Sequence, residues 1–194
     1  MALKSIISFA HALLEDAVTP GDTVIDCTMG NGNDTLFLAN LVGKAGHVLA
    51  FDIQESALEN TKKRLEQHGI ADTQVSLIQA SHADLAQHIP AGARGKVKAA
   101  IFNLGYLLGG DKQICTLPHT TIAALEALRS AVAAGGMIVL VVYPGHAEGE
   151  REASEVLEYC KHLPRDEMNV VAYQILNNPN SPPFVIALEK RGVE

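Results

Sequence analysis

The sequence predicts an α/β fold in which a seven-stranded, mostly parallel sheet carries helices on both faces. Apolar runs of β type alternate with segments of helical periodicity along the 194 residues, which is the order expected of a parallel sheet. Short runs that are apolar throughout, such as MIVLVVY at residues 137–143, are typical of central strands buried on both faces. The last two strands are joined by LNNPNSPP, which is too short for a helical crossover, so they should be antiparallel neighbours.

Each element follows from these patterns in chain order. Strands are predicted at residues 23–27, 47–52, 74–79, 97–102, 137–143, within 169–175, and at 184–190. Helices are predicted near residues 33–42, 55–68, 82–88, 118–133 and 149–162. The N-terminal segment predicts an amphipathic helix rather than a signal peptide, because His11, Glu15 and Asp16 interrupt it at helical spacing. One domain over residues 1–194 is expected from this length, with the Rossmann-like architecture of class I methyltransferases.

Charge and cysteine content limit the possible classes of function. The net charge is −7, and the basic clusters at 62–64 and 94–98 are scattered, so charge alone does not indicate a nucleic-acid partner. Three cysteines without a CxxC pair favour a reducing cytoplasm over a disulfide framework or a zinc site. The histidine spacing predicts no metal site, and no apolar run approaches the roughly 20 residues of a membrane span.

The segment DCTMGNGNDT at residues 26–35 places glycines and carboxylates after the first predicted strand. Gly30 and Gly32 permit a sharp turn and let a ligand approach the backbone, and Asn33 or Asp34 is predicted to cap the next helix. The dinucleotide pattern G-x-G-x-x-G lacks its third glycine here, and the nearby acids would disfavour a pyrophosphate. They favour a cation such as S-adenosylmethionine (SAM), for which D-x-x-x-G-x-G is the usual class I methyltransferase loop. The predicted cofactor residues in this loop are Asp26, Met29, Gly30, Asn31, Gly32, Asn33 and Asp34.

Two further strand ends are predicted to hold the adenosine part of such a cofactor. Asp52 ends the second strand, where a carboxylate can accept hydrogen bonds from both ribose hydroxyls, as it also does in NAD enzymes. A helix-capping Asp52 is the alternative. Ile53 and Gln54 follow, with Ile53 expected to cover the adenine. Ser81 and His82 follow the third strand and are expected beside the adenine, although Ser81 has an equal claim as a helix cap.

The fourth strand runs into Asn103-Leu104-Gly105-Tyr106, the predicted acceptor loop. An asparagine at the end of an apolar strand is costly to bury without partners. The position resembles the (D/N)-P-P-Y loop of methyltransferases that act on amino nitrogens, with Leu-Gly in place of Pro-Pro. In that loop the amide oxygen holds the substrate nitrogen in line with the methyl group, and the aromatic ring packs on the substrate. A turn-forming Asn103 and a core-edge Tyr106 are the alternative.

The end of the predicted fifth strand supplies the last two residues of the predicted site. Tyr143 and His146 stand at the same carboxyl edge of the sheet and are expected to line the substrate pocket. An alkylamine must lose a proton before it attacks, and His82 or His146 is predicted to relay it. A surface role for His146 is the alternative. The loop at 177–184 is either part of the substrate rim or a stiff hairpin. The predicted catalytic residues are Asn103, Tyr106 and His146, and Asn103 is also a predicted cofactor-binding residue. The predicted substrate-binding residues are Leu104, Gly105, Tyr106, Lys112, Tyr143 and His146.

The motifs TMGNGNDT, AFDIQ, FNLGYLLGGDK, VVYPGH and NPNSPPFVIALEK together resemble a bacterial family of small class I methyltransferases, long labelled rRNA methylases. The resemblance covers nearly the whole chain. It implies SAM as methyl donor, tRNA as substrate and a homodimer. Characterised members methylate 5-aminomethyl-2-thiouridine at the tRNA wobble position. The resemblance places SAM on the glycine loop, Asp52 and Ser81-His82, and the reacting base at Asn103 to Tyr106.

Lys4, Lys112 and Arg94 are the expected basic contacts to the anticodon stem-loop, and Tyr106 and Tyr143 are the aromatic rings on which a splayed base would stack. Three other functions remain open. An NAD-dependent oxidoreductase would need the missing third glycine. A methyltransferase for rRNA or a small-molecule amine would keep the same SAM site. A SAM-binding module without catalysis would not need the Asn103 loop.

Overall fold

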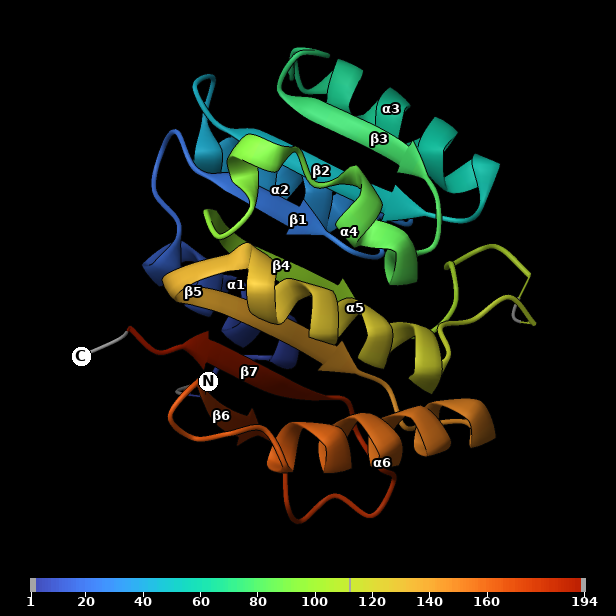
Figure 1. Ribbon diagram of the computed structural model, residues 1–194. Coiled ribbons are helices and arrows are strands. Elements are labelled where there is room, and N and C mark those ends of the chain that lie inside the picture. Colours follow the sequence, from blue (N-terminus) through green and yellow to red (C-terminus); the bar gives the residue numbers. More distant parts are fainter. Residues whose placement is uncertain (1–2, 112, 193–194) are drawn as a thin grey trace.

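The computed structural model describes residues 3–111 and 113–192 and contains the predicted seven-stranded sheet (Figure 1). Its strand order is β3-β2-β1-β4-β5-β7-β6. All neighbours from β3 to β5 pair in parallel, and β7 pairs antiparallel with both β5 and β6. The single reversed strand near the C-terminus is therefore confirmed. The strands are β1 Thr23–Asp26, β2 His47–Asp52, β3 Val75–Gln79, β4 Val97–Asn103, β5 Val132–Val142, β6 Met168–Tyr173 and β7 Phe184–Lys190.

Helices cover both faces of this sheet, as predicted. Figure 1 shows α4, α5 and α6 in front of the sheet and α1 and α2 behind it. The helices are α1 Ile6–Ala17, α2 Asn33–Val42, α3 Glu55–Gln67, α4 Leu85–His88, α5 Pro118–Ala131 and α6 Ala147–Lys161, with short 3-10 turns η1 His82–Asp84 and η2 Ala91–Ala93. In the part of the chain that the structure describes, no helix is long and apolar enough to cross a membrane.

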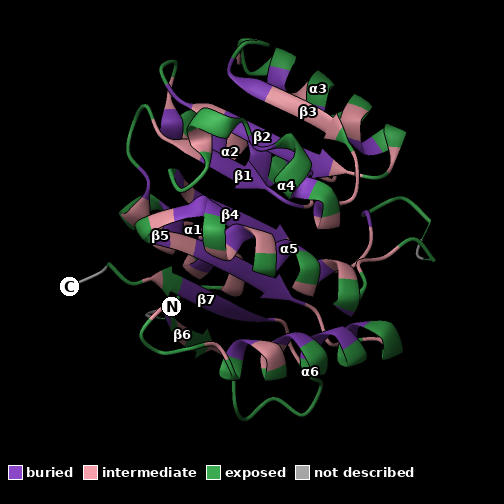
Figure 2. Ribbon diagram, in the orientation of Figure 1, coloured by how far each residue is buried: buried purple, intermediate pink, exposed green. Residues whose placement is uncertain are grey.

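Strand residues alternate between two apolar layers. Ile25 faces the layer under α5 and α6, and its neighbour Val24 faces the layer under α1 and α2. Phe51 and Phe102 fill the first of these layers and are fully buried. Figure 2 shows the central strands buried along most of their length, whereas the edge strand β6 is largely exposed. The uniformly apolar strands thus mark the middle of the sheet, as the sequence predicts.

The boundary between α5 and β5 differs from the prediction. The helix predicted at 118–133 ends at Ala131, and the strand predicted at 137–143 begins at Val132, with no loop between them. The Lys190 ammonium donates to the carbonyls of Arg129 and Val132, which satisfies carbonyl groups at this helix end. The pairing between β4 and β5 then shifts register, and Gly135 has a φ of +69°, so an irregular start lets the strand continue directly from the helix.

The helix predicted at 82–88 is two short pieces, η1 and α4, because Asp84 leaves helical geometry at the join. The remaining predicted boundaries shift by one or two residues. The segments 23–27 and 74–79 are each one residue shorter, 97–102 is one longer, and 55–68 ends at Gln67. The segment within 169–175 is 168–173, and 149–162 becomes 147–161. Shifts of this size are common at the ends of elements.

The strand order reverses between β1 and β4, whose carboxyl ends lie side by side. Crevices at such a reversal point are where ligands bind in open α/β sheets. Thr28, just after β1, accepts a 2.7 Å hydrogen bond at Oγ1 from the backbone N–H of Asn103, the last residue of β4. The fold therefore joins the glycine loop directly to the predicted acceptor loop.

Candidate active site

The glycine loop is shaped by contacts from α3. Gly32 caps α2 in the left-handed conformation, with φ +77° and no side-chain cap, so the predicted cap by Asn33 or Asp34 is wrong. The Thr61 hydroxyl donates to the Gly30 carbonyl at 3.0 Å, and Arg64 Nε donates to the Asn31 carbonyl at 2.6 Å. Arg64 therefore holds the loop, although its basic cluster gave no such indication.

Asp52 faces the glycine loop from the end of β2. Its Oδ2 accepts the Gly30 backbone N–H at 3.0 Å, and its Oδ1 accepts the Gln54 N–H at the same distance. A carboxylate has about four acceptor sites, so both oxygens retain capacity for further donors. Asp52 lines a cavity, as a ribose ligand requires, and the ribose contact itself stays a prediction.

Asp26 lies behind the loop and is fully buried. It accepts the Thr35 hydroxyl at 2.6 Å and the Thr28 backbone N–H at 3.1 Å. Burial, and then the neighbouring Asp34 carboxylate, raise the pKa of Asp26 well above its ordinary value. Asp26 and Gly32 line neither of the two cavities described below, so they shape the loop from behind.

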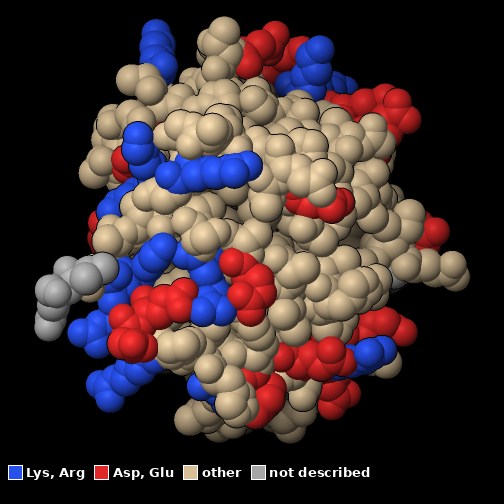
Figure 3. Space-filling model, viewed as in Figure 1, with Lys and Arg blue, Asp and Glu red and all other residues tan. Residues whose placement is uncertain are grey.

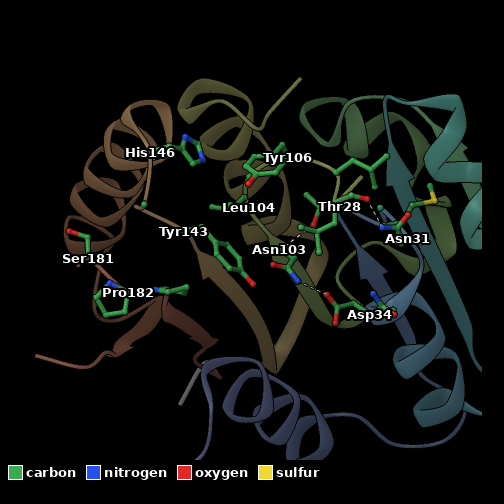
Figure 4. A pocket seen from close by; sticks show the side chains of 18 of the residues that line it. Thr28, Asn31, Asp34, Asn103, Leu104, Tyr106, Tyr143, His146, Ser181 and Pro182 are labelled. Atoms are coloured by element: carbon green, nitrogen blue, oxygen red, sulfur yellow. Dashed lines mark hydrogen bonds between the residues drawn. The ribbon is translucent and has the colours of Figure 1, made fainter. Parts of the chain in front are cut away.

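Asn103 is oriented by Asp34, a contact that the sequence did not predict. Asn103 Nδ2 donates to Asp34 Oδ2 at 3.1 Å. Because an ionised carboxylate only accepts hydrogen bonds, this contact requires the amide nitrogen to face Asp34. Figure 4 shows the amide oxygen of Asn103 turned away from Asp34, toward the side where Tyr143 lies. Both side chains line the same cavity, so Asn103 presents an acceptor oxygen to it.

Two cavities meet at the Asn103 loop. The larger cavity, about 430 Å³, extends from the glycine loop across Asn103 to the residues after β5. The smaller cavity, about 150 Å³, lies between the ends of β2 and β3 on one side and residues within 103–107 and 114–120 on the other. Predicted residues that line the larger cavity are Met29, Gly30, Asn31, Asn33, Asp34, Asn103, Leu104, Gly105, Tyr106, Tyr143 and His146. Those that line the smaller one are Gly30, Asp52, Ile53, Gln54, Ser81, His82, Asn103, Gly105 and Tyr106.

The predicted substrate residue Lys112 lies outside the described residues. The loop at 177–184 contributes residues 180–183 to the lining of the larger cavity. This agrees with the interpretation of the loop as part of the rim of the substrate pocket. No group of three or more His, Cys, Asp or Glu side chains that could hold a metal ion occurs in the described parts of the chain.

Ser81 and His82 are held by the protein itself. Ser81 Oγ accepts the Ala83 backbone N–H at 3.2 Å and thereby caps η1. His82 Nδ1 lies 3.2 Å from the Cys27 carbonyl, which can only accept, so Nδ1 carries the proton. His82 Nε2 lies 3.2 Å from the Thr120 hydroxyl. Burial lowers the pKa of His82 from 6.5 to about 4, so this ring is neutral at neutral pH.

We expect the buried His82 to make the protein less stable in acid. Between pH 6.5 and 4 the unfolded chain binds a proton on this ring and the folded chain does not. The free energy of unfolding therefore falls as the pH is lowered through this range. The expected loss from pH 7 to pH 5 is about 2 kcal/mol. Urea denaturation at both pH values should show this loss in the wild type and in Thr120→Val, which keeps the histidine. In His82→Gln this fall in unfolding free energy between pH 7 and pH 5 should disappear. The same fall in His82→Gln as in the wild type would show that His82 does not cause it.

His146 caps α6 and faces the larger cavity. Its Nδ1 accepts the Gly149 backbone N–H at 3.0 Å, so in the neutral ring the proton is on Nε2. The Nε2 atom is buried and has no hydrogen-bond partner among the residues that the structure describes. The His146 ring lies 5.9 Å from the Tyr106 ring, centroid to centroid. Burial, and then Asp34, raise the pKa of Tyr143, which therefore keeps its hydroxyl proton.

A buried carboxylate on α6 fastens the acceptor loop. Thr116 Oγ1 accepts the Gly105 backbone N–H at 2.9 Å and donates to Glu152 Oε2 at 2.6 Å. Glu152 also accepts the Thr121 hydroxyl at 2.7 Å and is 2% exposed. Burial raises the pKa of Glu152, and the two threonine hydroxyls oppose this rise. Sequence reasoning missed this cluster, because a glutamate within an amphipathic helix carries no signal of burial.

Transfer of a group between two ligands requires that both are held at one point, and here the two cavities share Asn103. The strand order, with the reversed β7 beside β5, is that of the Rossmann-like class I methyltransferase fold. A family described as "Putative rRNA methylase" matches residues 48–189. The chain belongs to this family of methyltransferases.

Three known proteins are similar to this chain over nearly its whole length. The chloroplastic tRNA (mnm(5)s(2)U34)-methyltransferase of Arabidopsis thaliana is 39% identical over 96% of this chain and 70% of its own length. A crystal structure from Clostridium thermocellum, described as a "putative rRNA-methylase", is 40% identical, covers 98% of this chain and 100% of its own, and has a TM-score of 0.93. A Streptococcus mutans structure, described as a "putative methyltransferase" in complex with SAH, is 36% identical over 97% of this chain and 99% of its own, with a TM-score of 0.86.

Proposed function

We propose that the protein transfers a methyl group from SAM to the amino group of 5-aminomethyl-2-thiouridine at the wobble position of tRNA, giving the 5-methylaminomethyl form. The observation that carries this proposal is the acceptor oxygen of Asn103 at the point shared by the two cavities. The name of the Arabidopsis relative, 39% identical over 96% of the chain, supports the same nucleoside.

The residues around both cavities suit a cationic cofactor. Asp34 lines the larger cavity and Asp52 the smaller one, and no lysine or arginine is among the described residues that line either. Asp34 and Asp52 would repel a pyrophosphate here, which argues against the NAD-dependent alternative. When bound, SAM supplies a methyl group already activated on a sulfonium. Asp52, Ile53 and Ser81 would hold its adenosine, and the glycine loop its amino acid part.

The larger cavity suits an amine acceptor. Asn103 Oδ1 would accept an N–H of the amine and so orient the nitrogen lone pair. Asp34 lines this cavity and offers the negative charge that an alkylammonium group needs on entry. His146 Nδ1 already accepts the Gly149 N–H, so this ring has no free basic nitrogen for the predicted proton relay. The protonated Nδ1 and the low pKa of His82 disfavour that histidine as a relay as well.

Contacts to the anticodon stem-loop are proposed at the carboxyl edge of the sheet. The Lys4 carbonyl accepts the hydroxyl of Tyr173, the last residue of β6, so Lys4 lies near that edge. Arg94 precedes β4 and lies at the opposite edge from Asn103, so the proposal does not retain it. On the face in Figure 3, lysine and arginine side chains gather mostly at the left, where the strands begin in Figure 1. Tyr106 and Tyr143 remain the proposed stacking platforms.

We further propose a homodimer that acts in the cytoplasm, with residues 1–194 forming one domain. The three cysteines are free, which fits a reducing compartment. The edge strand β6 and the segment after it expose the apolar side chains Val171, Ile175 and Leu176. An exposed apolar surface of this kind fits a contact between two copies of the chain. Light scattering of the purified protein tests the dimer directly.

Nucleoside mass spectrometry tests the function. Purified tRNA that carries 5-aminomethyl-2-thiouridine is incubated with the protein and SAM. We expect a gain of one methyl on that nucleoside with the wild type and with Asp72→Ala, an exposed acid outside both cavities. Asp52→Ala should abolish the gain at low SAM concentration, because the ribose contact is lost. Methylation of another nucleoside or of rRNA instead would refute the proposed acceptor and keep the cofactor.

A further inference from the structure

The N-terminal helix contributes a side chain to the active site. His11 Nε2 lies 2.7 Å from Asp34 Oδ1, and the other oxygen of the same carboxylate accepts Asn103 Nδ2 at 3.1 Å. Three elements that are distant in sequence, α1, α2 and the end of β4, are thus joined through one carboxylate. The His11 side chain is 24% exposed and that of Asp34 is 8% exposed.

The position of the imidazole is fixed by a second contact. The His11 ring stacks on Phe37, with centroids 3.8 Å apart and planes 8° from parallel. Phe37 and Asp34 lie one turn apart on α2, so the same helix face holds the plane of the ring and takes its N–H. The contact therefore has a defined geometry rather than being a loose surface pair.

The orientation of Asn103 depends on where the Asp34 carboxylate points. One Asp34 oxygen is occupied by His11, which leaves the other to face the Asn103 amide nitrogen. Without the His11 donor, the carboxylate can rotate and the amide loses its fixed partner. The Asn103 oxygen would then no longer be held toward the acceptor cavity.

We propose that His11 is a positioning residue for methyl transfer, which acts through Asp34 to orient the Asn103 amide. The kinetic part of this inference rests on the proposed function. His11 lies before residue 48, where the family match begins, and in sequence it is only a polar interruption of an amphipathic helix. The proposal gives it a role in turnover rather than in cofactor binding.

Three variants separate this role from simple packing of α1. His11→Leu keeps a side chain of similar bulk and removes the donor, whereas His11→Gln retains an N–H donor at similar reach. Ser5→Ala removes the N-cap of α1, whose hydroxyl accepts the Ser8 N–H at 3.2 Å, and does not touch Asp34. Ser5→Ala should weaken the helix by about 1 kcal/mol and leave turnover unchanged.

The first readout is kinetic. We expect His11→Leu to lower kcat on the aminomethyl tRNA about 10-fold, with the SAM Kd and the tRNA KM within about twofold of the wild type. His11→Gln should recover most of kcat. Equal losses in the leucine and glutamine variants, or in Ser5→Ala, would overturn the positioning role in favour of a structural one.

The second readout needs no acceptor and so stands apart from the proposed function. The side-chain amide resonance of Asn103, assigned by its disappearance in Asn103→Ala, is recorded by ¹H–¹⁵N NMR. It should shift and exchange faster with solvent in His11→Leu, and stay near the wild-type position in His11→Gln and Ser5→Ala. An unmoved resonance in His11→Leu refutes the inference, even if the wild type methylates no tRNA. A wild type inactive on the aminomethyl tRNA refutes the proposed acceptor alone.

Discussion

Replacing Asn103 with alanine is expected to lower kcat for methyl transfer by about 10²-fold or more, because the amine loses the oxygen that aligns its lone pair. The SAM Kd should change by less than about threefold, since the adenosine is expected in the smaller cavity, at Asp52 and Ser81. Single-turnover assays on the aminomethyl tRNA give the rate, and calorimetric titration gives the affinity.

The control for this variant is Asn40→Ala. Asn40 lies on α2, where its side chain donates to the Leu36 carbonyl within the helix, and it lines neither cavity. Its replacement should leave both kcat and the SAM Kd near the wild-type values. If Asn103→Ala weakened SAM binding in proportion to its loss of rate, Asn103 would be a cofactor or folding residue instead.

Replacing Gly32 with alanine is expected to destabilise the protein and to weaken SAM binding at least about 10-fold. Gly32 has φ +77°, where a side chain is strained, and its new Cβ would lie 2.9 Å from both the Cα and the Oγ1 of Thr61. Relief of this clash requires movement of the α3 backbone, and Thr61 is the residue that holds the Gly30 carbonyl. The glycine loop should therefore lose its shape.

Gly69→Ala is the matched control. Gly69 has φ +69°, and a Cβ there would meet nothing within 4 Å, so this variant carries the conformational strain without the clash. Gly32→Ala should exceed it by about 2 kcal/mol of unfolding free energy, or about 5 °C in Tm. Thermal unfolding and SAM titration of both variants provide the comparison. Equal effects in the two variants would show that strain alone, and not the contact with Thr61, limits this position.

The sequence predicted the central strands of the sheet well because their runs are apolar on both faces. The same reasoning placed Asp52 and Asn103 at strand ends, where residues from distant parts of the chain converge. It failed at the α5–β5 junction, because the contacts of Lys190 with Arg129 and Val132 join segments about 60 residues apart. The helix and strand propensities of the local sequence contain no information about such a long-range contact.

The supporting contacts of the site were the part that could not be predicted. His11, Thr61, Arg64 and Glu152 lie on helices whose periodicity only distinguishes inward from outward faces. Which inward polar side chain meets which loop depends on how α1, α3 and α6 cross the sheet. The assigned cap at Asn33 or Asp34 failed for a related reason, because Asp34 is drawn to His11 and Asn103 instead.

The wall between the two cavities is expected to couple the binding of the cofactor to the binding of the RNA. Six residues line both cavities: Thr28, Gly30, Asn103, Gly105, Tyr106 and Leu107. A molecule that orders this wall from one side removes part of the entropic cost of ordering it for a molecule on the other side. By linkage the effect is mutual, so cofactor and RNA should each strengthen the binding of the other. The demethylated cofactor would share most of these contacts. Its dissociation would then lower the affinity of the enzyme for the modified tRNA.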